Sequence, residues 1–412
     1  MKRQMLGWLC LLTLLFLLPA CRADGQESPG TDLSAGSQVP TETGEQPPPA
    51  PVDRSTKIGV VGRNASGNFR YQGWPSVCVD ENGVLYAVSS SYRLGHICPF
   101  GKNVMYTSEN GEDWSSPYII NDSIMDDRDV GILSLGDGKL LMSYFYNPPS
   151  YYYDYFTTNT ATTEILERLE EWRHLPEEQQ IRGGSYVRLS RDNGTTWEEP
   201  VWVPVTSPHG PVLLSDGRLL YVGNEWYTDG IAEEDYDTNA MLAFVSEDEG
   251  QTWEYLSRVN YRATGLYLCE PYAVELPDGT ILLALRGQGA SAAYEFTVYL
   301  SRSTNGGKTW TMPEETGFCG SPPHLLVHSS GAVVLTYGRR EAPCGVRARI
   351  SYDNGKTWSE EVILNDRSPD SDCGYPCSAE LPDGSIVTVY YQKYQEGEST
   401  SILYTKWWLP EA

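Results

Sequence analysis

Polar or ionisable residues stand in most of six segments of the chain that come just before a strand-forming run. Carboxylates, histidines and a tyrosine can transfer protons or attack a substrate, and the planar guanidinium of an arginine binds a carboxylate through two parallel hydrogen bonds. Packing alone does not require such groups at the ends of elements, so we expect the segments to share one site. They are Gly73-Trp74-Pro75, Asp127-Arg128-Asp129, Pro208-His209-Gly210, Cys269-Glu270-Pro271, Pro322-Pro323-His324 and Gly374-Tyr375-Pro376.

Each segment is followed by a strand, a tight turn and a second strand. The second strands are runs rich in β-branched, leucine and aromatic residues, such as TILLAL and SIVTVYY. An Asp-Gly pair between two such runs is a strong signal for a β-hairpin. The turns are Asn82-Gly83, Asp137-Gly138, Asp216-Gly217, Asp278-Gly279, Ser330-Gly331 and Asp383-Gly384.

A second repeat, the Trp turn, interleaves with these hairpins. It has a short polar residue, then a glycine that permits positive φ, then a closing tryptophan. The copies are Thr107–Trp114, Ser190–Trp197, Ser246–Trp253, Ser303–Trp310 and Ser351–Trp358. Repetition at a period of tens of residues indicates a repeat architecture. Together the two repeats predict an all-β fold, a six-bladed β-propeller with four-stranded antiparallel blades.

One long insertion interrupts the second blade, near Asn147–Tyr186. It opens with a cluster of tyrosines, and a helix is predicted near Thr162–His174 because that stretch is rich in Glu, Leu and Arg. A long insertion of this kind either overlies a binding face or is structural decoration, and the sequence favours neither.

The chain resembles the bacterial exo-sialidases, or neuraminidases, whose propellers carry the Asp-box repeat. The five Trp turns match the Asp box. In Glu270–Arg286, a Glu begins a strand, Asp-Gly follows eight residues on, and an Arg follows at sixteen, as in the sialidases. Tyr375 stands eight residues before Asp383-Gly384, as in the nucleophile segment of that family. Arg347 lies close to where the family places another carboxylate-binding arginine.

The resemblance implies a retaining exo-glycosidase that acts on terminal sialic acid or a related nine-carbon acidic sugar. Arg286 and Arg347 would bind the sugar's carboxylate. Tyr375 would be the nucleophile and Glu270 its base, because a neutral phenol is not repelled by the anionic substrate as a carboxylate would be.

The sequence departs from the family in two places. Gly73-Trp74-Pro75 stands where the family has Arg-Ile-Pro, so the first carboxylate-binding arginine is missing; Arg93, Arg70 or Arg128 could substitute. The general acid expected shortly after Arg93 is also missing. The proton donor is then His96 or a carboxylate of Asp126–Asp129, among which we favour Asp127 or Asp129. In addition, His209 and His324 are expected to face the substrate, or to be hydrogen-bonded structural histidines.

The N-terminus reads as a targeting segment. Lys2 and Arg3 precede an apolar run that ends in Leu18-Pro19-Ala20-Cys21, which resembles the bacterial lipobox. We expect a signal peptide at 1–20, a lipidated Cys21 with a disordered tether at 21–57, and the propeller at 58–412. The protein would then be a lipoprotein at the cell surface, attached to the membrane only through its lipid anchor.

The formal net charge of −25 argues against nucleic acid or an anionic membrane surface as a partner. An acidic glycan would have to be drawn by a local basic pocket, which is feasible because salt screens distant charge beyond about 8 Å. No metal or organic cofactor is implied. Two other interpretations stay open: an enzyme for another acidic sugar, or for transfer to an acceptor within the same sugar; and a non-catalytic propeller that binds glycans.

Overall fold

The computed structural model describes residues 54–64, 66–176, 183–226, 237, 239–261, 265–289 and 292–410. The chain divides into two units, Met1–Val52 and Asp53–Ala412, and only the second is described. The predicted signal peptide at 1–20, Cys21 and nearly all of the tether at 21–57 lie outside the described residues. Within the described ranges, no helix has the length and apolarity needed to cross a membrane.

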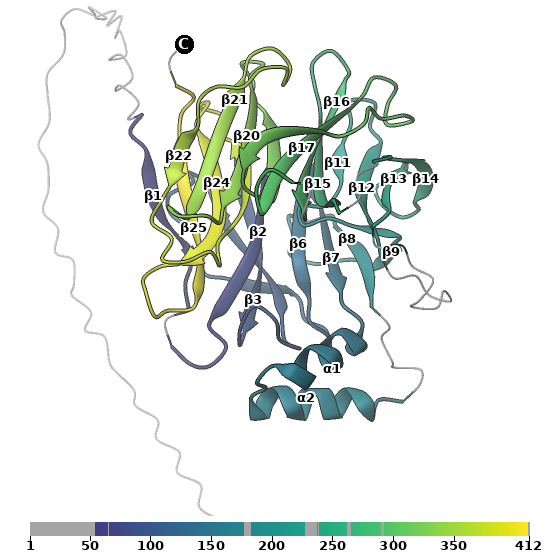
Figure 1. The fold of residues 1–412 in the computed structure, drawn as a ribbon, viewed down its shortest axis with the longest axis vertical. Coiled ribbons are helices and arrows are strands. Elements are labelled where there is room, and N and C mark those ends of the chain that lie inside the picture. Colours follow the sequence, from purple (N-terminus) through teal and green to yellow (C-terminus); the bar gives the residue numbers. More distant parts are fainter. Residues whose placement is uncertain are drawn as a thin grey trace, which may run out of the picture. The chain divides into compact units, whose positions relative to one another are not determined.

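Six antiparallel sheets form the blades of a propeller, which confirms the predicted fold (Figure 1). Blade one consists of β2 (Tyr71–Val79), β3 (Leu85–Arg93), β4 (Lys102–Ser108) and β5 (Tyr118–Asn121). Blade two consists of β6 (Arg128–Gly136), β7 (Lys139–Tyr146), β8 (Gly184–Ser190) and β9 (Val201–Val203). Blade three has a broken inner strand, with β10 (Val205–Thr206), β11 (Val212–Leu213), β12 (Leu219–Glu225), β13 (Met241–Ser246) and β14 (Glu254–Arg258).

The remaining blades complete the ring. Blade four consists of β15 (Tyr267–Glu275), β16 (Ile281–Gln288), β17 (Phe296–Ser303) and β18 (Glu314–Cys319). Blade five consists of β19 (Pro323–Val327), β20 (Val333–Arg339), β21 (Gly345–Ser351) and β22 (Val362–Asn365). Blade six joins β23 (Gly374–Glu380), β24 (Ile386–Lys393) and β25 (Thr400–Trp407) to the N-terminal strand β1 (Lys57–Gly62). Since β1 supplies the outermost strand, the two ends of the propeller close the ring together.

The inner strands surround a common axis. β2 contacts β6 and β23, β6 contacts β11, β12 contacts β15, and β19 contacts both β15 and β23. Alternate residues of neighbouring sheets fill the space between blades with apolar side chains. For example, Val77 and Leu85 of blade one pack with Val387 and Val389 of blade six. Burial between the sheets is therefore what holds the blades together.

The Trp turns connect the third and fourth strands of five blades. In the turn after β13, Asp248 accepts hydrogen bonds from the Thr252 amide (2.8 Å) and hydroxyl (2.7 Å), and Trp253 Nε1 donates to the Gly250 carbonyl. Gly250 has φ of 88° and lies against Leu141 of the preceding blade, so a side chain there would be strained and crowded. These turns are therefore scaffold, and each one fastens a blade to its neighbour.

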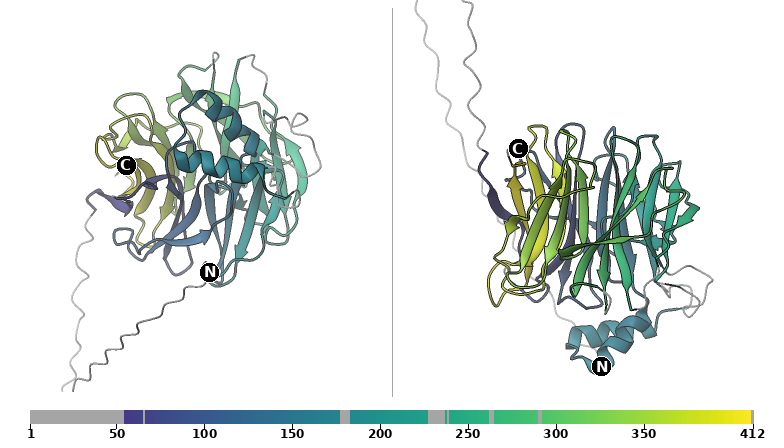
Figure 2. Two further views of the ribbon diagram at one scale, coloured as in Figure 1. Left: turned by 90° about the horizontal axis from the view of Figure 1, so that it is seen from below. Right: turned by 45° about the horizontal axis from the view of Figure 1, so that its top comes forward.

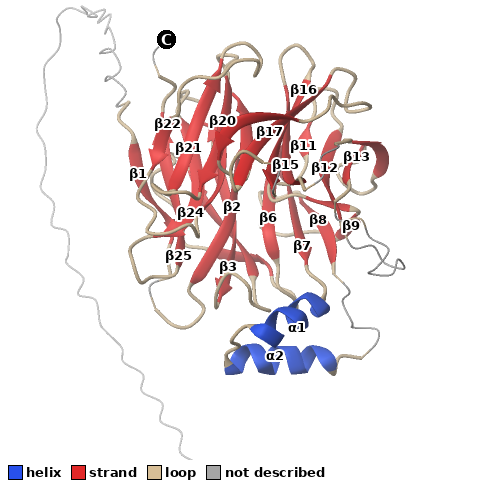
Figure 3. Cartoon of the chain, in the orientation of Figure 1, coloured by secondary structure: helices blue, strands red, loops and turns tan. Residues whose placement is uncertain are grey.

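The insertion in blade two forms two helices, one more than the sequence predicts. α1 (Pro149–Thr158) begins with Pro149 at the first helical position and buries Tyr152; α2 (Thr163–Arg173) is capped by Thr162. Aromatic residues are weak helix formers, which hid α1, and burial of Tyr152 supplies the missing stability. The helices lie together at one end of the sheets (Figures 2 and 3).

That end also carries the six polar segments. Arg128, at the start of β6, pairs with Phe145 near the end of β7, and the chain leaves β7 for α1. The Trp turns lie at the opposite end, because Ser246 at the last position of β13 pairs with Leu219 at the first position of β12. The insertion therefore borders the face that contains the candidate site.

Candidate functional site

Four inner strands, β2, β6, β15 and β23, carry a one-residue bulge near their start. The residue at each bulge has left-handed backbone: Trp74 (φ 51°), Asp129 (46°), Glu270 (48°) and Tyr375 (50°). Such conformations are costly for residues other than glycine, and they persist where surrounding structure imposes them. A bulge redirects a side chain, so the same device at the same level of four blades brings four side chains toward one place.

Tyr375, Glu270 and Arg286 form a connected group. Tyr375 Oη donates a 2.5 Å hydrogen bond to Glu270 Oε1, and Arg286 Nη1 donates a 2.8 Å bond to Glu270 Oε2. Burial and the charge of Glu270 raise the pKa of Tyr375 well above its usual value. Burial opposes ionisation of Glu270, but the Arg286 charge and the two hydrogen bonds outweigh it and lower the pKa of Glu270. An ionised carboxylate thus accepts from a neutral phenol, which is the arrangement of a base and a latent nucleophile.

A second arginine beside Tyr375 is Arg340, which the sequence analysis did not select. Its guanidinium lies 5.5 Å from the Tyr375 ring centre, donates to the Tyr391 hydroxyl (3.3 Å), and donates to the Cys373 carbonyl (3.1 Å). Arg286 and Arg340 both contact the ring of Phe296. Arg340 directly follows β20, the second strand of its blade, and Arg286 lies near the end of the equivalent strand β16. This equivalent position in two blades is the feature of the sequence that could have identified Arg340 as a site residue.

Arg347, which the sequence analysis placed in the site, lies elsewhere. It is 1% exposed and donates to Glu361 (3.0 Å) and to the carbonyls of Asn365 (2.5 Å) and Pro343 (2.9 Å). These bonds fasten β21 to β22 and to the preceding loop. The guanidinium of Arg347 is therefore occupied within blade five, and its substrate-binding role stays a prediction.

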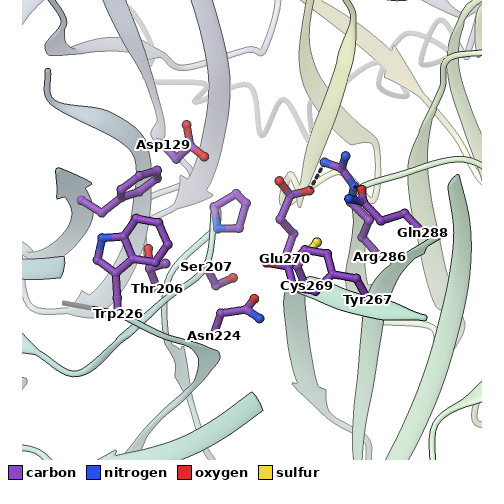
Figure 4. Close-up of a pocket in the computed structure, with 12 residues that line it drawn as sticks. Asp129, Thr206, Ser207, Asn224, Trp226, Tyr267, Cys269, Glu270, Arg286 and Gln288 are labelled. Atoms are coloured by element: carbon purple, nitrogen blue, oxygen red, sulfur yellow. Dashed lines mark hydrogen bonds and ion pairs between the residues drawn. The ribbon is translucent and has the colours of Figure 1, made fainter. Parts of the chain in front are cut away.

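A pocket of about 220 Å³ opens beside this group, between blades two, three and four. Figure 4 shows Asp129 and Trp226 on one side of it, and Glu270 and Arg286 on the other. Its remaining lining is mixed, with aromatic and small polar side chains: Phe145, Thr206, Ser207, Pro208, Asn224, Tyr267, Cys269 and Gln288. Aromatic walls with a few polar groups suit a sugar ring.

Asp129 is the carboxyl group that lines this pocket opposite Glu270. Burial, helped by the charge of Glu270, raises the pKa of Asp129 to about 7, although Arg128 acts in the other direction. Among the described residues, nothing lies within hydrogen-bonding distance of its Oδ1. A carboxyl group that is partly protonated at neutral pH can donate a hydrogen bond or a proton to a bound sugar.

Asp127, the other favoured carboxylate, has a structural role instead. Its two oxygens accept from the amide (2.9 Å) and hydroxyl (2.8 Å) of Ser123, and it is fully buried. Burial raises the pKa of Asp127 to about 7, but the group holds the loop before β6 and does not line the pocket. Of the two candidates, the structure brings only Asp129 to Glu270.

Trp74 fills the place where the resemblance implies an arginine. It is 1% exposed, its ring lies 6.4 Å from Tyr375, and the guanidinium groups of Arg128 and Arg93 lie over it at 4.2 and 4.8 Å. Arg93 is fully buried, donates to both oxygens of Asp126 and is not among the residues that line the pocket, so its substrate-binding role stays a prediction. Arg128 lies on Trp74 as the remaining basic group of this corner.

His96 stands at the rim of the same aromatic corner. Its Nδ1 lies 3.0 Å from Asp372 Oδ1 and 2.8 Å from Tyr71 Oη, and its side chain is 42% exposed. Asp372, which the sequence analysis missed, also accepts from the hydroxyl groups of Tyr71 (3.0 Å) and Tyr391 (3.1 Å). Its position two residues before Gly374-Tyr375-Pro376 was a usable signal.

His209 and His324 lie together in the interior, where they are 4% and 3% exposed. Their rings are 5.1 Å apart, and His324 stacks on Tyr272 and lies 3.2 Å from Cys377 Sγ. Burial lowers the pKa of His209 to about 4 and that of His324 well below its usual value. The structure therefore favours the structural alternative for both, and it does not place them in the substrate pocket.

In the part of the chain that the structure describes, no cluster of three or more His, Cys, Asp or Glu side chains is arranged to hold a metal ion. Tyr375, Glu270 and Arg286 are bonded to one another, whereas Asp129 Oδ1 has no hydrogen-bond partner among the described residues. What the arrangement offers chemically is a phenol paired with a carboxylate, a second carboxyl group across a pocket, and two arginines beside the phenol.

Two curated proteins share sequence with parts of this chain. An anhydrosialidase from Macrobdella decora is 29% identical over 181 residues, which are 38% of this chain and 22% of that protein. A sialidase from Clostridium perfringens is 25% identical over 173 residues, which are 37% of this chain and 44% of that protein. The matched regions thus span less than half of either relative.

Solved structures share the fold along most of the chain. A protein of unknown function from Dyadobacter fermentans has a TM-score of 0.67 at 24% identity, over 85% of this chain and 98% of that one. A sialidase from Streptococcus pneumoniae has a TM-score of 0.61 at 13% identity (85% and 70% covered), and an α-L-arabinanase from Penicillium chrysogenum 0.58 at 13% (85% and 98%). At these identities the likeness extends to the fold alone.

The family model for the BNR repeat-like domain matches residues 173–389, which carry four of the five Trp turns and the segments of Glu270 and Tyr375. This match covers more than half of the chain. Together with the six blades and the distant sequence similarity to sialidases, it establishes the relationship. The chain belongs to the BNR repeat-like family and is a sialidase-like six-bladed propeller.

Proposed function

We propose that this propeller is a retaining exo-glycosidase that removes terminal sialic acid, or a related nine-carbon acidic sugar, from glycans. The observation that carries the proposal is the 2.5 Å hydrogen bond from Tyr375 to Glu270, with Arg286 bonded to Glu270 and Arg340 near the Tyr375 ring. A phenol is a weak nucleophile, so a bonded carboxylate base has a clear purpose in catalysis. The names of the two curated relatives support the same class of reaction.

The first step forms a bond between Tyr375 Oη and the anomeric carbon. Glu270 takes the phenolic proton as the oxygen attacks, and the glycosidic bond breaks with its electron pair on the leaving oxygen. A proton donor must neutralise that oxygen; Asp129 and His96 are the two candidates at this face. Arg286 and Arg340 lie close to the pair of Tyr375 and Glu270 and would hold the sugar's carboxylate while the anomeric carbon gains positive charge.

The second step releases the sugar. Water attacks the anomeric carbon, the former proton donor now takes the water's proton, and Tyr375 leaves as its oxygen recovers a proton from Glu270. Two displacements at one carbon give net retention of configuration. If a hydroxyl of the sugar itself attacked instead of water, the same residues would give an anhydro product.

Trp74 favours one alternative substrate class. A buried tryptophan in the place of the first arginine leaves two flanking arginines instead of three, so an acidic sugar other than sialic acid is the second candidate. A panel of fluorogenic sialosides and uronides, together with sialyl-lactose, would separate the two, with identification of the released sugar by mass. Release from sialosides supports the main proposal, release from uronides alone replaces it, and binding without release refutes the enzyme.

We also propose that the protein is a lipoprotein at the cell surface, with Cys21 acylated and residues 21–57 acting as a tether. The support is the sequence pattern of residues 1–21. Detergent phase partition of the full-length protein tests this. The native chain should enter the detergent phase and Cys21→Ser should remain in the aqueous phase; equal partition of both would refute it.

A further inference from the structure

The loop after β3 holds His96 unusually firmly for an exposed residue. Its carbonyl oxygen accepts from Arg93 Nη2 and Arg128 Nη1, each at 3.2 Å, so two buried guanidinium groups fix its backbone. Its ring is fixed through Nδ1, and one edge packs on Trp74 at 5.0 Å between ring centres. Ordering a partly exposed side chain costs conformational entropy, so a surface residue without a functional role is seldom held in one conformation.

Asp372 determines which ring nitrogen is available. The carboxylate oxygen can only accept, so Nδ1 donates its proton to Asp372 Oδ1 at 3.0 Å. The same oxygen accepts from Tyr71 and Tyr391, which fixes Asp372 in turn. Nε2 is then the nitrogen of the 42% exposed ring that is left for a ligand, since none of the described residues bonds to it. Carboxylate-imidazole pairs orient histidines in this way when the second nitrogen exchanges protons.

The position of the ring suits a leaving group better than Asp129 does. Asp129 is 7% exposed, lines the pocket with Glu270, and its charge raises the pKa of Tyr375, so it lies on the nucleophile's side. In an exo-acting enzyme the leaving group is the rest of the glycan, which must extend to solvent. A donor for its oxygen must therefore stand at the exposed rim, where His96 stands.

We propose that His96 is the proton donor to the leaving group and the base for the attacking water, with Asp372 as its positioning residue. The proposal rests on the glycosidase function proposed above and adds the identity of the acid. In the first step the Nε2 proton moves to the glycosidic oxygen as its bond to the anomeric carbon breaks. In the second step Nε2 takes a proton from the attacking water, which restores the imidazolium.

The groups that face His96 determine its titration. They come from every element packed against it: Tyr71 of β2, Arg93 of β3, Arg128 of β6, Arg340 after β20, Asp372 before β23 and Tyr391 of β24. Burial lowers the pKa of His96, Arg128 and Arg340 lower it further, and Asp372 partly offsets them. Because the acid must be protonated, activity should be greatest at mildly acidic pH and should fall as pH rises through that pKa.

The test compares leaving groups in His96→Asn, Asp129→Asn and Asp372→Asn. His174→Asn is the control, because the side chain of that histidine, directly after α2, is 73% exposed. Sialyl-lactose needs a proton donor, whereas an activated aryl sialoside departs without one. His96→Asn should lower kcat/KM by about 10²- to 10⁴-fold on sialyl-lactose but by less than about tenfold on the aryl sialoside. It should also abolish the fall in kcat/KM at higher pH.

Asp372→Asn should lower kcat on sialyl-lactose with little change in KM, and should move the fall in activity to lower pH. Equal losses on both substrates in His96→Asn would overturn the assignment, and so would the leaving-group pattern appearing in Asp129→Asn instead. Wild-type protein that cleaves neither substrate refutes the glycosidase proposal itself, and the role of His96 with it. Dependence on leaving group without dependence on His96 refutes the role of His96 alone.

Discussion

Replacing Glu270 with Gln removes the proposed base while preserving the size and shape of the side chain. The amide oxygen can still accept one hydrogen bond from Tyr375 or Arg286, so we expect the local structure to remain. What is lost is the ability to take the phenolic proton, together with the negative charge beside Arg286. Turnover should fall because the nucleophile then has to ionise without help.

The size of the loss follows from the chemistry of the phenol. A tyrosine with its ordinary pKa of about 10 is ionised in roughly one molecule in a thousand at pH 7. Burial raises the pKa of Tyr375 further, so the unaided fraction is smaller still. Since each factor of ten equals about 1.4 kcal/mol, the base must supply at least about 4 kcal/mol. We therefore predict that kcat falls by about 10³-fold or more.

The assay is steady-state turnover of a fluorogenic sialoside, with circular dichroism and thermal unfolding to confirm the fold. Glu249→Gln is a matched control, because Glu249 also has a left-handed backbone (φ 59°) and also pairs with basic side chains, but it lies in a Trp turn at the opposite end of the blades. The double variant of Glu270→Gln with Tyr375→Phe should be no slower than Tyr375→Phe alone. A folded Glu270→Gln protein that retains a tenth of wild-type kcat would refute the reasoning.

Three further predictions concern binding and stability. Arg340→Met should raise KM for a sialoside by about tenfold to a hundredfold in turnover assays. Arg347→Met should instead lower the free energy of unfolding by about 3 kcal/mol in denaturant titrations, because the substitution leaves the buried partners of Arg347 unpaired. Trp74→Ala should cost about 3 to 5 kcal/mol in the same titrations, because it empties a fully buried site. Hydrogen bonds from threonine hold the pKa of Asp192 and Asp353 below the usual value, so thermal unfolding temperatures should drop as pH falls below about 4.

Each of these predictions has an outcome that contradicts it. A change in KM for Arg347→Met without loss of stability would return that residue to the site. Wild-type stability in Trp74→Ala would mean that the neighbouring aromatic rings refill its place. For the acid effect, a depressed carboxyl pKa stabilises the folded state above the unfolded value and loses that contribution below it. Asp353→Asn should therefore weaken the pH dependence, and an unchanged dependence contradicts the prediction.

Spacing along a hairpin explains why part of the site was predictable from sequence. Cys269 pairs directly with Arg286 across β15 and β16, so a separation of sixteen residues around an Asp-Gly turn necessarily returns the arginine to Glu270. The same reasoning located Tyr375 at the start of β23. Residues that belong to one hairpin are related by local geometry, which a single sequence records.

The features that the sequence did not predict depend on contacts with residues outside a single hairpin. Arg340 and Arg347 belong to the same hairpin, and what separates them is Glu361, directly before β22, which binds Arg347 within the blade. The sequence predicted Arg93 as a substrate-binding residue, but its guanidinium donates hydrogen bonds to Asp126, which lies just before the second blade. Helix α1 was missed because its stability comes from burying Tyr152, whose hydroxyl also donates to Asp126. The local sequence pattern around a residue does not show which distant residues it contacts in the folded chain.

Peptide mapping of the rapidly quenched protein would show whether the sugar becomes covalently bonded to Tyr375. An activated aryl sialoside should form the glycosyl-enzyme faster than water removes the sugar, so the intermediate should accumulate. We expect the added mass of one sugar residue on Tyr375, and no added mass on the Tyr375→Phe protein. Sugar attached to another residue, or turnover in which no adduct forms and the first released sugar has inverted configuration, would contradict it.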